Sequence, residues 1–300
     1  MFAPASLATG LLLSLAFGAG AWFATSEAIE SDAHARFRSM ARASQYMIDA
    51  RIKSYSNVLR GAAGLFRAAP DTSADQFRQY VQQLDIKRNF PGIEVINYAR
   101  AVHAPGLAAL NEELRGRLAR RGVHHYQPLV AQPDRNTYTV LVYIEPLLPL
   151  SLTKLGMDLE ARGATRRVLA SARDSGLPSA SGTRIELFSG PNQNGLALRL
   201  PVYRSDMPTD TVEGRRLAYI GSVGIGFGVA RLVGGVLDEF PIRGARLILT
   251  ELTAVTPEPG ETPPRAMLYD SLASPERPKP PPPLDDSSVF ATSLPIEFNQ

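Results

Sequence analysis

The chain contains no cysteine, which excludes disulfides, thiolate nucleophiles and thiolate metal sites. Lysine is scarce as well, since 28 of the 32 basic residues are arginine, and these are spread among 29 acidic residues. The net charge of +3 therefore gathers into no basic patch, and we expect no nucleic-acid partner. Only four histidines are present, and the adjacent His124 and His125 would point to opposite faces of a strand. We therefore expect neither a metal site nor a cofactor.

Charged side chains are missing from residues 1–26. Residues 3–24 are mostly apolar or small, and a helix of that length at ~1.5 Å per residue covers the roughly 30 Å core of a bilayer. Trp22 and Phe23 end this stretch, as is typical of aromatic residues at a membrane interface. We expect a transmembrane anchor over residues 1–26. A cleaved signal peptide is the alternative, because Ala19-Gly20-Ala21 resembles a cleavage site.

Residues 27–69 contain no proline and predict a long stalk helix. The apolar residues in its second half are spaced by four and three in turn: Ile48, Ile52, Tyr55, Leu59, Ala62 and Phe66. We expect this half to pack on its own domain. The first half carries Phe37 and Met40 among charged residues, and we expect it to pair with a second copy of the chain.

Residues 70–300 alternate short helices with strands, which indicates an α+β fold. We expect Thr72 or Ser73 to cap one helix and apolar residues near Leu110 to mark another. Two further helices are predicted over residues 162–174 and 229–237. The predicted strands cover residues 93–102, 137–145, 183–188, 196–203, 217–227, 245–253 and 289–298.

Ten of the 24 prolines fall between Pro257 and Pro283. The run PKPPPP cannot join a sheet and favours an extended polyproline conformation. We interpret residues 257–283 as a long variable loop rather than as a peptide motif for a partner domain.

Four segments together resemble the CHASE domain, an extracytoplasmic ligand-sensing module of membrane receptors. The main one is YIEPLLPLSLTKLGMDLEARGATRRVLASARDSGLPSASG at residues 143–182. The others follow the family's order: YSNVLRGAAGLF at 55–66, FPGIEVINYA at 90–99 and LRLPVYRS at 198–205. The resemblance implies a stalk helix carrying two PAS-like antiparallel sheets, a distal one in residues of about 70–240 and a proximal one in residues of about 241–300.

The resemblance also implies where a ligand binds. In the plant cytokinin receptors of this family, a carboxylate reads the ligand's adenine, and the matching position here is Thr139. A threonine hydroxyl cannot accept as many hydrogen bonds as a carboxylate, so we expect a different small molecule. The implied ligand-binding residues are Thr139, Met157, Leu169, Ala180, Ser181 and Arg184.

Three other groups of residues allow two interpretations. Gly224, Gly226 and Gly228 mark close backbone approach in a strand and could also form the floor of a pocket. Arg173 with Asp174 predicts a structural ion pair, with anion binding by the arginine as the alternative. Glu145 and Asp158 are available for acid–base chemistry, but each also has a structural use at the end of a strand or after a turn.

These observations predict a sensor and not an enzyme. We expect a single-pass protein of the inner membrane with most of its chain in the periplasm, a homodimer formed through the stalk, and a small-molecule ligand. The resemblance implies that longer relatives carry a histidine kinase or a diguanylate cyclase or phosphodiesterase as output. The alternative functions are an anchored or secreted binding protein without signalling output and, less supported, an enzyme.

Overall fold

The computed structural model describes residues 4–161, 163–180, 185–187, 190–242, 245–250, 267–272 and 290–296. The side chains of residues 4–10, 12, 164, 186 and 190–194 are outside this description. The chain divides into two units, which are treated separately below. The smaller combines residues 1–47 with 282–295, and the larger combines residues 48–281 with 296–300.

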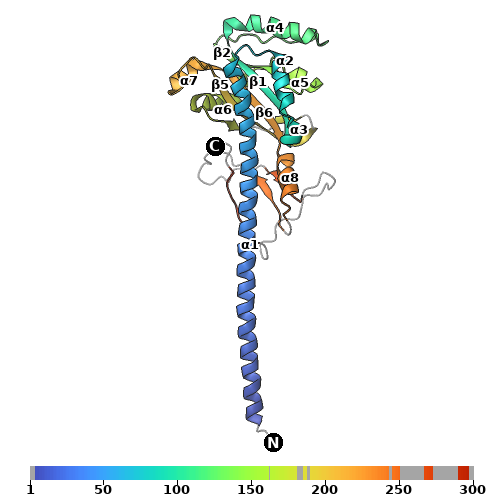
Figure 1. The fold of residues 1–300 in the computed structure, drawn as a ribbon, viewed down its shortest axis with the longest axis vertical. Helices are drawn as coiled ribbons and strands as arrows, with labels where there is room; N and C mark the ends of the chain where they lie inside the picture. The colour runs from blue at the N-terminus through green and yellow to red at the C-terminus, as the bar shows by residue number, and fades with distance from the viewer. Residues whose placement is uncertain are drawn as a thin grey trace. The chain divides into compact units, whose positions relative to one another are not determined.

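The larger unit is an antiparallel sheet surrounded by helices, which confirms the α+β class (Figure 1). Its main sheet has the order β2-β1-β6-β5-β3, and β4 pairs with β5. A second sheet pairs β7 with β8. The strands are β1 Ile93–His103, β2 Thr137–Glu145, β3 Ser179–Ala180, β4 Ile185–Leu187, β5 Gly190–Tyr203, β6 Tyr219–Gly228, β7 Ile248–Thr250 and β8 Met267–Asp270.

Helices account for most of the remaining described residues. The longest, α1, covers Pro4–Ala68 and so contributes to both units. The others are α2 Ala74–Gln83, α3 Ile86–Asn89, α4 Leu107–Ala119, α5 Pro149–Lys154, α6 Gly163–Ser175, α7 Val212–Ala218 and α8 Val229–Glu239, with 3₁₀ turns η1 Ala104–Gly106 and η2 Leu159–Ala161.

The second half of α1 forms one side of the core of the larger unit. All six residues of its apolar seam, from Ile48 to Phe66, are buried. Tyr55 meets Phe227 of β6 edge-on at 5.3 Å, and Phe66 stacks on Tyr98 of β1 at 3.7 Å between ring centres. The Tyr55 hydroxyl also donates a hydrogen bond to the Pro91 carbonyl. The expected packing of this half of the stalk on its own domain is confirmed.

Local sequence signals explain several boundaries. Ser73 caps α2 through a capping box, in which its hydroxyl accepts from the Gln76 backbone N–H and the Gln76 side chain accepts from the Ser73 N–H. Strand β2 has the predicted bounds, and its burial is nearly continuous. On α4, every fourth residue from Leu110 to Leu118 is buried, as the predicted apolar face requires.

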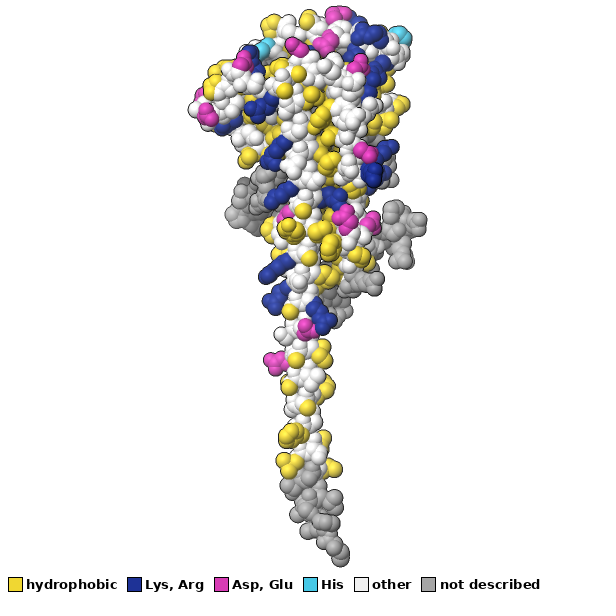
Figure 2. Space-filling model, in the orientation of Figure 1, with side chains coloured by type: hydrophobic (Ala, Val, Ile, Leu, Met, Phe, Trp, Pro, Cys, Tyr) yellow, Lys and Arg dark blue, Asp and Glu magenta, His cyan; other side chains and the backbone are white. Residues whose placement is uncertain are grey.

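The smaller unit contains residues 4–47 of α1 and residues 290–295. Phe290 lies against His34 and Phe37, with ring centres 3.7 Å and 6.0 Å away. The described leucine, phenylalanine and tryptophan side chains from Leu11 to Phe23 are largely exposed (Figure 2). Among the residues with described side chains, no helix includes a stretch long and apolar enough to cross a membrane.

Two strand predictions and one loop prediction need correction. The strand expected over residues 217–227 begins only at Tyr219, because Thr211 caps a helix, α7, whose last residues are Leu217 and Ala218. Residues 290–296 are not in a strand, since Phe290 instead packs on α1. The predicted loop over residues 257–283 contains β8, which pairs with β7. The remainder of that loop, apart from residues 271–272, and residues 251–253 lie outside the described residues.

Candidate functional site: the polar face of the sheet

The two faces of the main sheet differ in chemistry. Strand register places Tyr98, Val223 and Leu200 side by side on the face that packs against α1. The other face carries Asn97, Gly224 and Arg199 in one row. We call this second face, with Thr139 and Ser222, the polar face. It lies inside the protein, where polar groups need partners.

Arg199 is the central side chain of the polar face. It is only 6% exposed. Its Nε donates to the Ser222 hydroxyl at 3.0 Å, Nη1 to the Asn97 Oδ1 at 2.9 Å and Nη2 to the Ser222 carbonyl at 3.1 Å. Burial lowers the pKa of Arg199 to about 10, so the guanidinium stays charged at pH 7.

Thr139 belongs to the same polar network. It is buried, and its hydroxyl donates to Glu160 Oε1 at 2.5 Å. The Tyr219 hydroxyl is hydrogen-bonded to Thr139 and to Ser222, and burial raises the pKa of Tyr219. Thr139 is the first of the predicted ligand-binding residues. The Tyr219 hydroxyl connects it to Ser222, which accepts hydrogen bonds from Arg199.

The two acidic residues near Thr139, Asp158 and Glu160, already form ion pairs with Arg135. Arg135 contacts Asp158 at 2.5 Å and Glu160 at 3.5 Å. Asp158 also accepts backbone hydrogen bonds from Thr139 and Glu160, as its predicted structural role requires. The other carboxylate considered for acid–base chemistry, Glu145, lies 3.4 Å from Arg78 Nε.

The remaining predicted ligand-binding residues are spread across the domain. Leu169 is buried on α6, which contacts η2 and β5, and Met157 is 45% exposed. Ala180 lies in β3, opposite Leu198, whereas its neighbour Ser179 lies opposite Arg199. Since β2 and β3 are at the two ends of the strand order, Thr139 and Ala180 are separated by four strand spacings, at least about 19 Å across a flat sheet. Ser181 and Arg184 lie outside the described residues.

Two of the open interpretations are resolved by contacts. Asp174 receives hydrogen bonds from Arg173 at 2.9 Å and from Arg216 of α7 at 2.5 Å, so the arginine–aspartate pair is structural. Gly224 and Gly226 permit close approach, because a Cβ on Gly224 would lie 2.5 Å from Arg199 Nη1 and one on Gly226 would lie 2.6 Å from a Val95 methyl. Gly224 thus makes room for the guanidinium.

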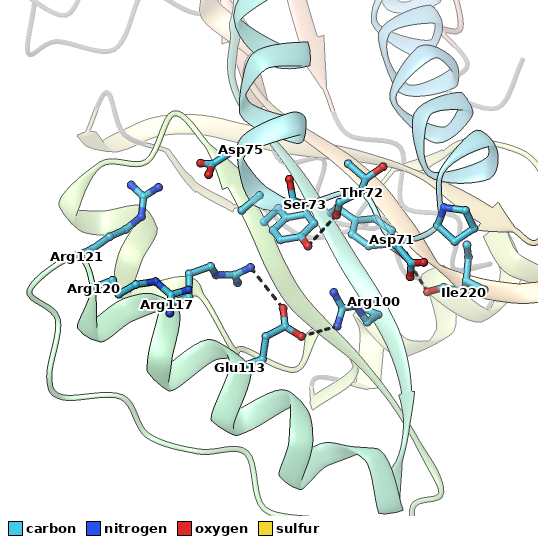
Figure 3. A pocket seen from close by; sticks show the side chains of 14 residues that line it. Asp71, Thr72, Ser73, Asp75, Arg100, Glu113, Arg117, Arg120, Arg121 and Ile220 are labelled. Atoms are coloured by element: carbon cyan, nitrogen blue, oxygen red, sulfur yellow. Dashed lines mark hydrogen bonds and ion pairs between the residues drawn. The ribbon is translucent and has the colours of Figure 1, made fainter.

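A second candidate lies on the other side of the sheet. It is an open cleft of about 950 Å³ between the start of α2, the helix α4 and strands β1 and β2, which we call the arginine cleft (Figure 3). Its basic residues are Arg100, Arg117, Arg120 and Arg121. Glu113 lies between the first two of these, 2.9 Å from Arg100 and 3.7 Å from Arg117.

The arginine cleft is built on aromatic residues. Arg117 lies over the Tyr143 ring, 5.0 Å from its centre, and also donates to the Val142 carbonyl. The Tyr143 hydroxyl donates to the Thr72 carbonyl at 3.0 Å, and the Tyr98 hydroxyl donates to the Ile220 carbonyl at 3.1 Å. Asp71 and Asp75 also line the cleft, so its lining carries both signs of charge.

No metal centre is visible in the described part of the chain, where no three histidine, aspartate or glutamate side chains are grouped to hold an ion. Neither Arg199 nor the arginine cleft was predicted from the sequence. The signal for Arg199 was present, because it is the one charged residue in the run LALRLPVY of a predicted strand. The cleft joins residues from five separate segments, which no local pattern reveals.

A family model for the CHASE domain matches residues 70–263, which is more than half of the chain. The chain therefore belongs to the CHASE family of sensory domains. That family is not catalytic, which agrees with the expectation of a sensor.

Two solved structures are similar to this chain. One is an extracellular ligand-binding receptor from Desulfohalobium retbaense, with 14% identity and a TM-score of 0.41 over 68% of this chain and 27% of the receptor. This chain thus corresponds to about a quarter of that receptor's length. The other is the ligand-binding domain of the Pseudomonas aeruginosa amino-acid chemoreceptor PctC in complex with GABA, with 14% identity and a TM-score of 0.40 over 73% of each chain. No curated protein matches.

Proposed function

We propose that this chain is the ligand-sensing part of a membrane receptor, which binds a small molecule and passes a change of conformation to α1. The CHASE match over residues 70–263 is the observation that carries this proposal. The seam of α1 supports a route for the signal, because its buried residues from Ile48 to Phe66 contact the core rings of β1 and β6. A shift in the sheet would therefore act on α1 directly.

The proposed location is the inner membrane, with the sensor in the periplasm. The lack of charge in residues 1–26 supports an anchor there. Exposure of the apolar side chains Leu15, Phe17 and Phe23 supports it as well, since contiguous exposed apolar surface marks contact with a membrane or a partner. A homodimer through the first half of α1, and an output domain in longer relatives, are parts of the same proposal.

We place the ligand on the polar face. Support comes from Thr139, which the family resemblance assigns to the ligand, and from its hydrogen-bonded link to the centre of the sheet. A few buried polar groups on an otherwise apolar wall are typical of small-molecule sites. The arginine cleft is the second candidate location, favoured by its volume of about 950 Å³.

A thermal-shift screen of the full chain tests ligand binding. At a ligand concentration of 100 times Kd, binding stabilises the folded state by about 2.7 kcal/mol. For a domain of this size that is a rise in Tm of about 5–10 °C. We expect one chemical class of small molecules to produce such a rise. A library of metabolites in which no compound raises Tm would contradict the proposal.

A further inference from the structure

The buried cation Arg199 has no negative partner in the described chain. Its three hydrogen bonds all go to neutral acceptors, and among the described residues no ion pair involves it. The guanidinium has five N–H donors, so two remain for a further partner. Buried charges in proteins are ordinarily paired, because a charge removed from water is costly without a counterion.

The carboxylates near Arg199 are committed elsewhere. Glu160 and Asp158 both contact Arg135, and Glu160 also accepts the Thr139 hydroxyl. The polar face therefore has its negative charges neutralised at the β2 end, while the positive charge at its centre is held only by an amide, a hydroxyl and a carbonyl.

The sheet makes room for the guanidinium itself but, among its described residues, supplies no counterion. On the polar face, β6 presents Ser222, Gly224 and Gly226, whereas on the α1 face the same strand presents Val223, Ile225 and Phe227. The space at Gly224 is taken up by the Arg199 guanidinium and the Asn97 side chain, and the space at Gly226 by the Val95 and Ile185 side chains. Strand β6 thus gives Arg199 room but no negative charge.

We propose that the ligand of this domain carries a carboxylate and that Arg199 binds it through its free N–H donors. This inference rests on the proposed ligand-sensing function and adds the chemical class of the ligand. Arginine suits the role because its planar fork binds both oxygens of a carboxylate. The hydroxyl of Tyr219, which is hydrogen-bonded to Ser222 beside Arg199, offers a further polar group for the same ligand.

The test compares carboxylic acids with their neutral analogues. The full chain is titrated with amino acids and with short aliphatic and aromatic acids, each beside its primary amide and methyl ester. We expect the acid of at least one set to bind, and its amide and ester to bind at least 100-fold more weakly, since removing one member of a buried charge pair has an effect of this size.

Variants assign the effect to Arg199. We expect Arg199→Gln to weaken acid binding about 100-fold or more, and Arg199→Lys to weaken it about 10-fold, because lysine keeps the charge but loses the fork. Asn97→Asp places a carboxylate next to Nη1, where the Asn97 oxygen now lies 2.9 Å away. This internal counterion should raise the Tm of the ligand-free protein and abolish acid binding, so loss of binding is not confused with failure to fold.

Arg120→Gln and Arg121→Gln in the arginine cleft are the matched controls, and we expect both to bind the acid with unchanged affinity. Loss of acid binding in these controls, with full binding in Arg199→Gln and Asn97→Asp, would overturn the inference and move the ligand to the cleft. Binding of neutral or cationic compounds only would also overturn the inference and leave ligand sensing intact. Absence of binding by any class of compound would overturn both.

Discussion

Gly224 is the residue on which the position of Arg199 depends most directly. A Cβ at this position would lie 2.5 Å from Nη1 and 2.8 Å from Cζ of Arg199, and 2.9 Å from the Asn97 Oδ1. These distances are shorter than van der Waals contact, and the buried guanidinium cannot move into solvent. A side chain at residue 224 would therefore displace both Arg199 and its partner.

We expect Gly224→Ala to lower the free energy of unfolding by about 1–3 kcal/mol, as overpacking of a core does. Gly234→Ala on α8 is the control, because no described atom apart from its chain neighbours and the nearby backbone of its own helix lies within 4 Å of its Cβ position. The free energy of unfolding of the control should rise by about 0.4–1 kcal/mol, because alanine lowers the entropy of the unfolded chain. Urea denaturation measures the free energies of unfolding of both variants. Equal values for the two would show that Arg199 is not confined by Gly224.

Single residues were predicted from the sequence where their role is local. Asp158 binds backbone N–H groups next to its own turn, and Ser73 caps the helix that follows it, as expected. Arg199 and Glu113 depend on residues far away in the chain, so their surroundings are set by strand register and helix packing. For the same reason, the sequence could not show that Ser179, and not Ala180, lies opposite Arg199.

The helices α6 and α7 are joined by the ion pair between Asp174 and Arg216. The hydrogen bond from Arg216, with that from Arg173, holds the pKa of Asp174 at about 2. A carboxyl whose pKa is lowered by folding stabilises the protein above its unfolded pKa of about 3.9, and the stabilisation disappears as the pH falls towards 2.

We expect Asp174→Asn to cost about 1 kcal/mol of unfolding free energy at pH 7, a value discounted for partial exposure of the pair. The difference from wild type should narrow as the pH falls below 4. Denaturant titrations over this pH range provide the measurement. Asp206→Asn removes the fully exposed partner of Arg204 and should leave stability unchanged. A pH-independent difference for Asp174→Asn would contradict the ion-pair account.

Among the elements, the sequence predicted the second half of α1 and α4 well because their apolar residues recur with a helical period. It predicted β1 and β2 because both are rich in β-branched and aromatic residues. It failed for α7, where Leu217 to Phe227 reads as one apolar strand. The helix there is fixed by the Thr211 cap, whose hydroxyl accepts from the Gly214 N–H at 3.0 Å. Such a short helix has no apolar period of its own to reveal it.

The whole molecule is proposed to act as a homodimer in which α1 carries the signal. Single cysteines at successive positions from Phe37 to Met47 should crosslink in membranes with a helical period if two such helices pair. The chain has no native cysteine to interfere. Addition of ligand should change the pattern, because a signal requires two arrangements of a connected element. A flat profile, or a pattern that ligand leaves unchanged, would favour a binding protein without signalling output.

Binding of a small molecule by this CHASE domain is tested by calorimetric titration of the strongest compound from the thermal screen into the purified full chain. We expect saturable binding with one ligand per chain and a negative heat-capacity change, since the ligand becomes buried in the domain. Absence of saturable heat, or binding that persists after the domain is unfolded in urea, would contradict this expectation.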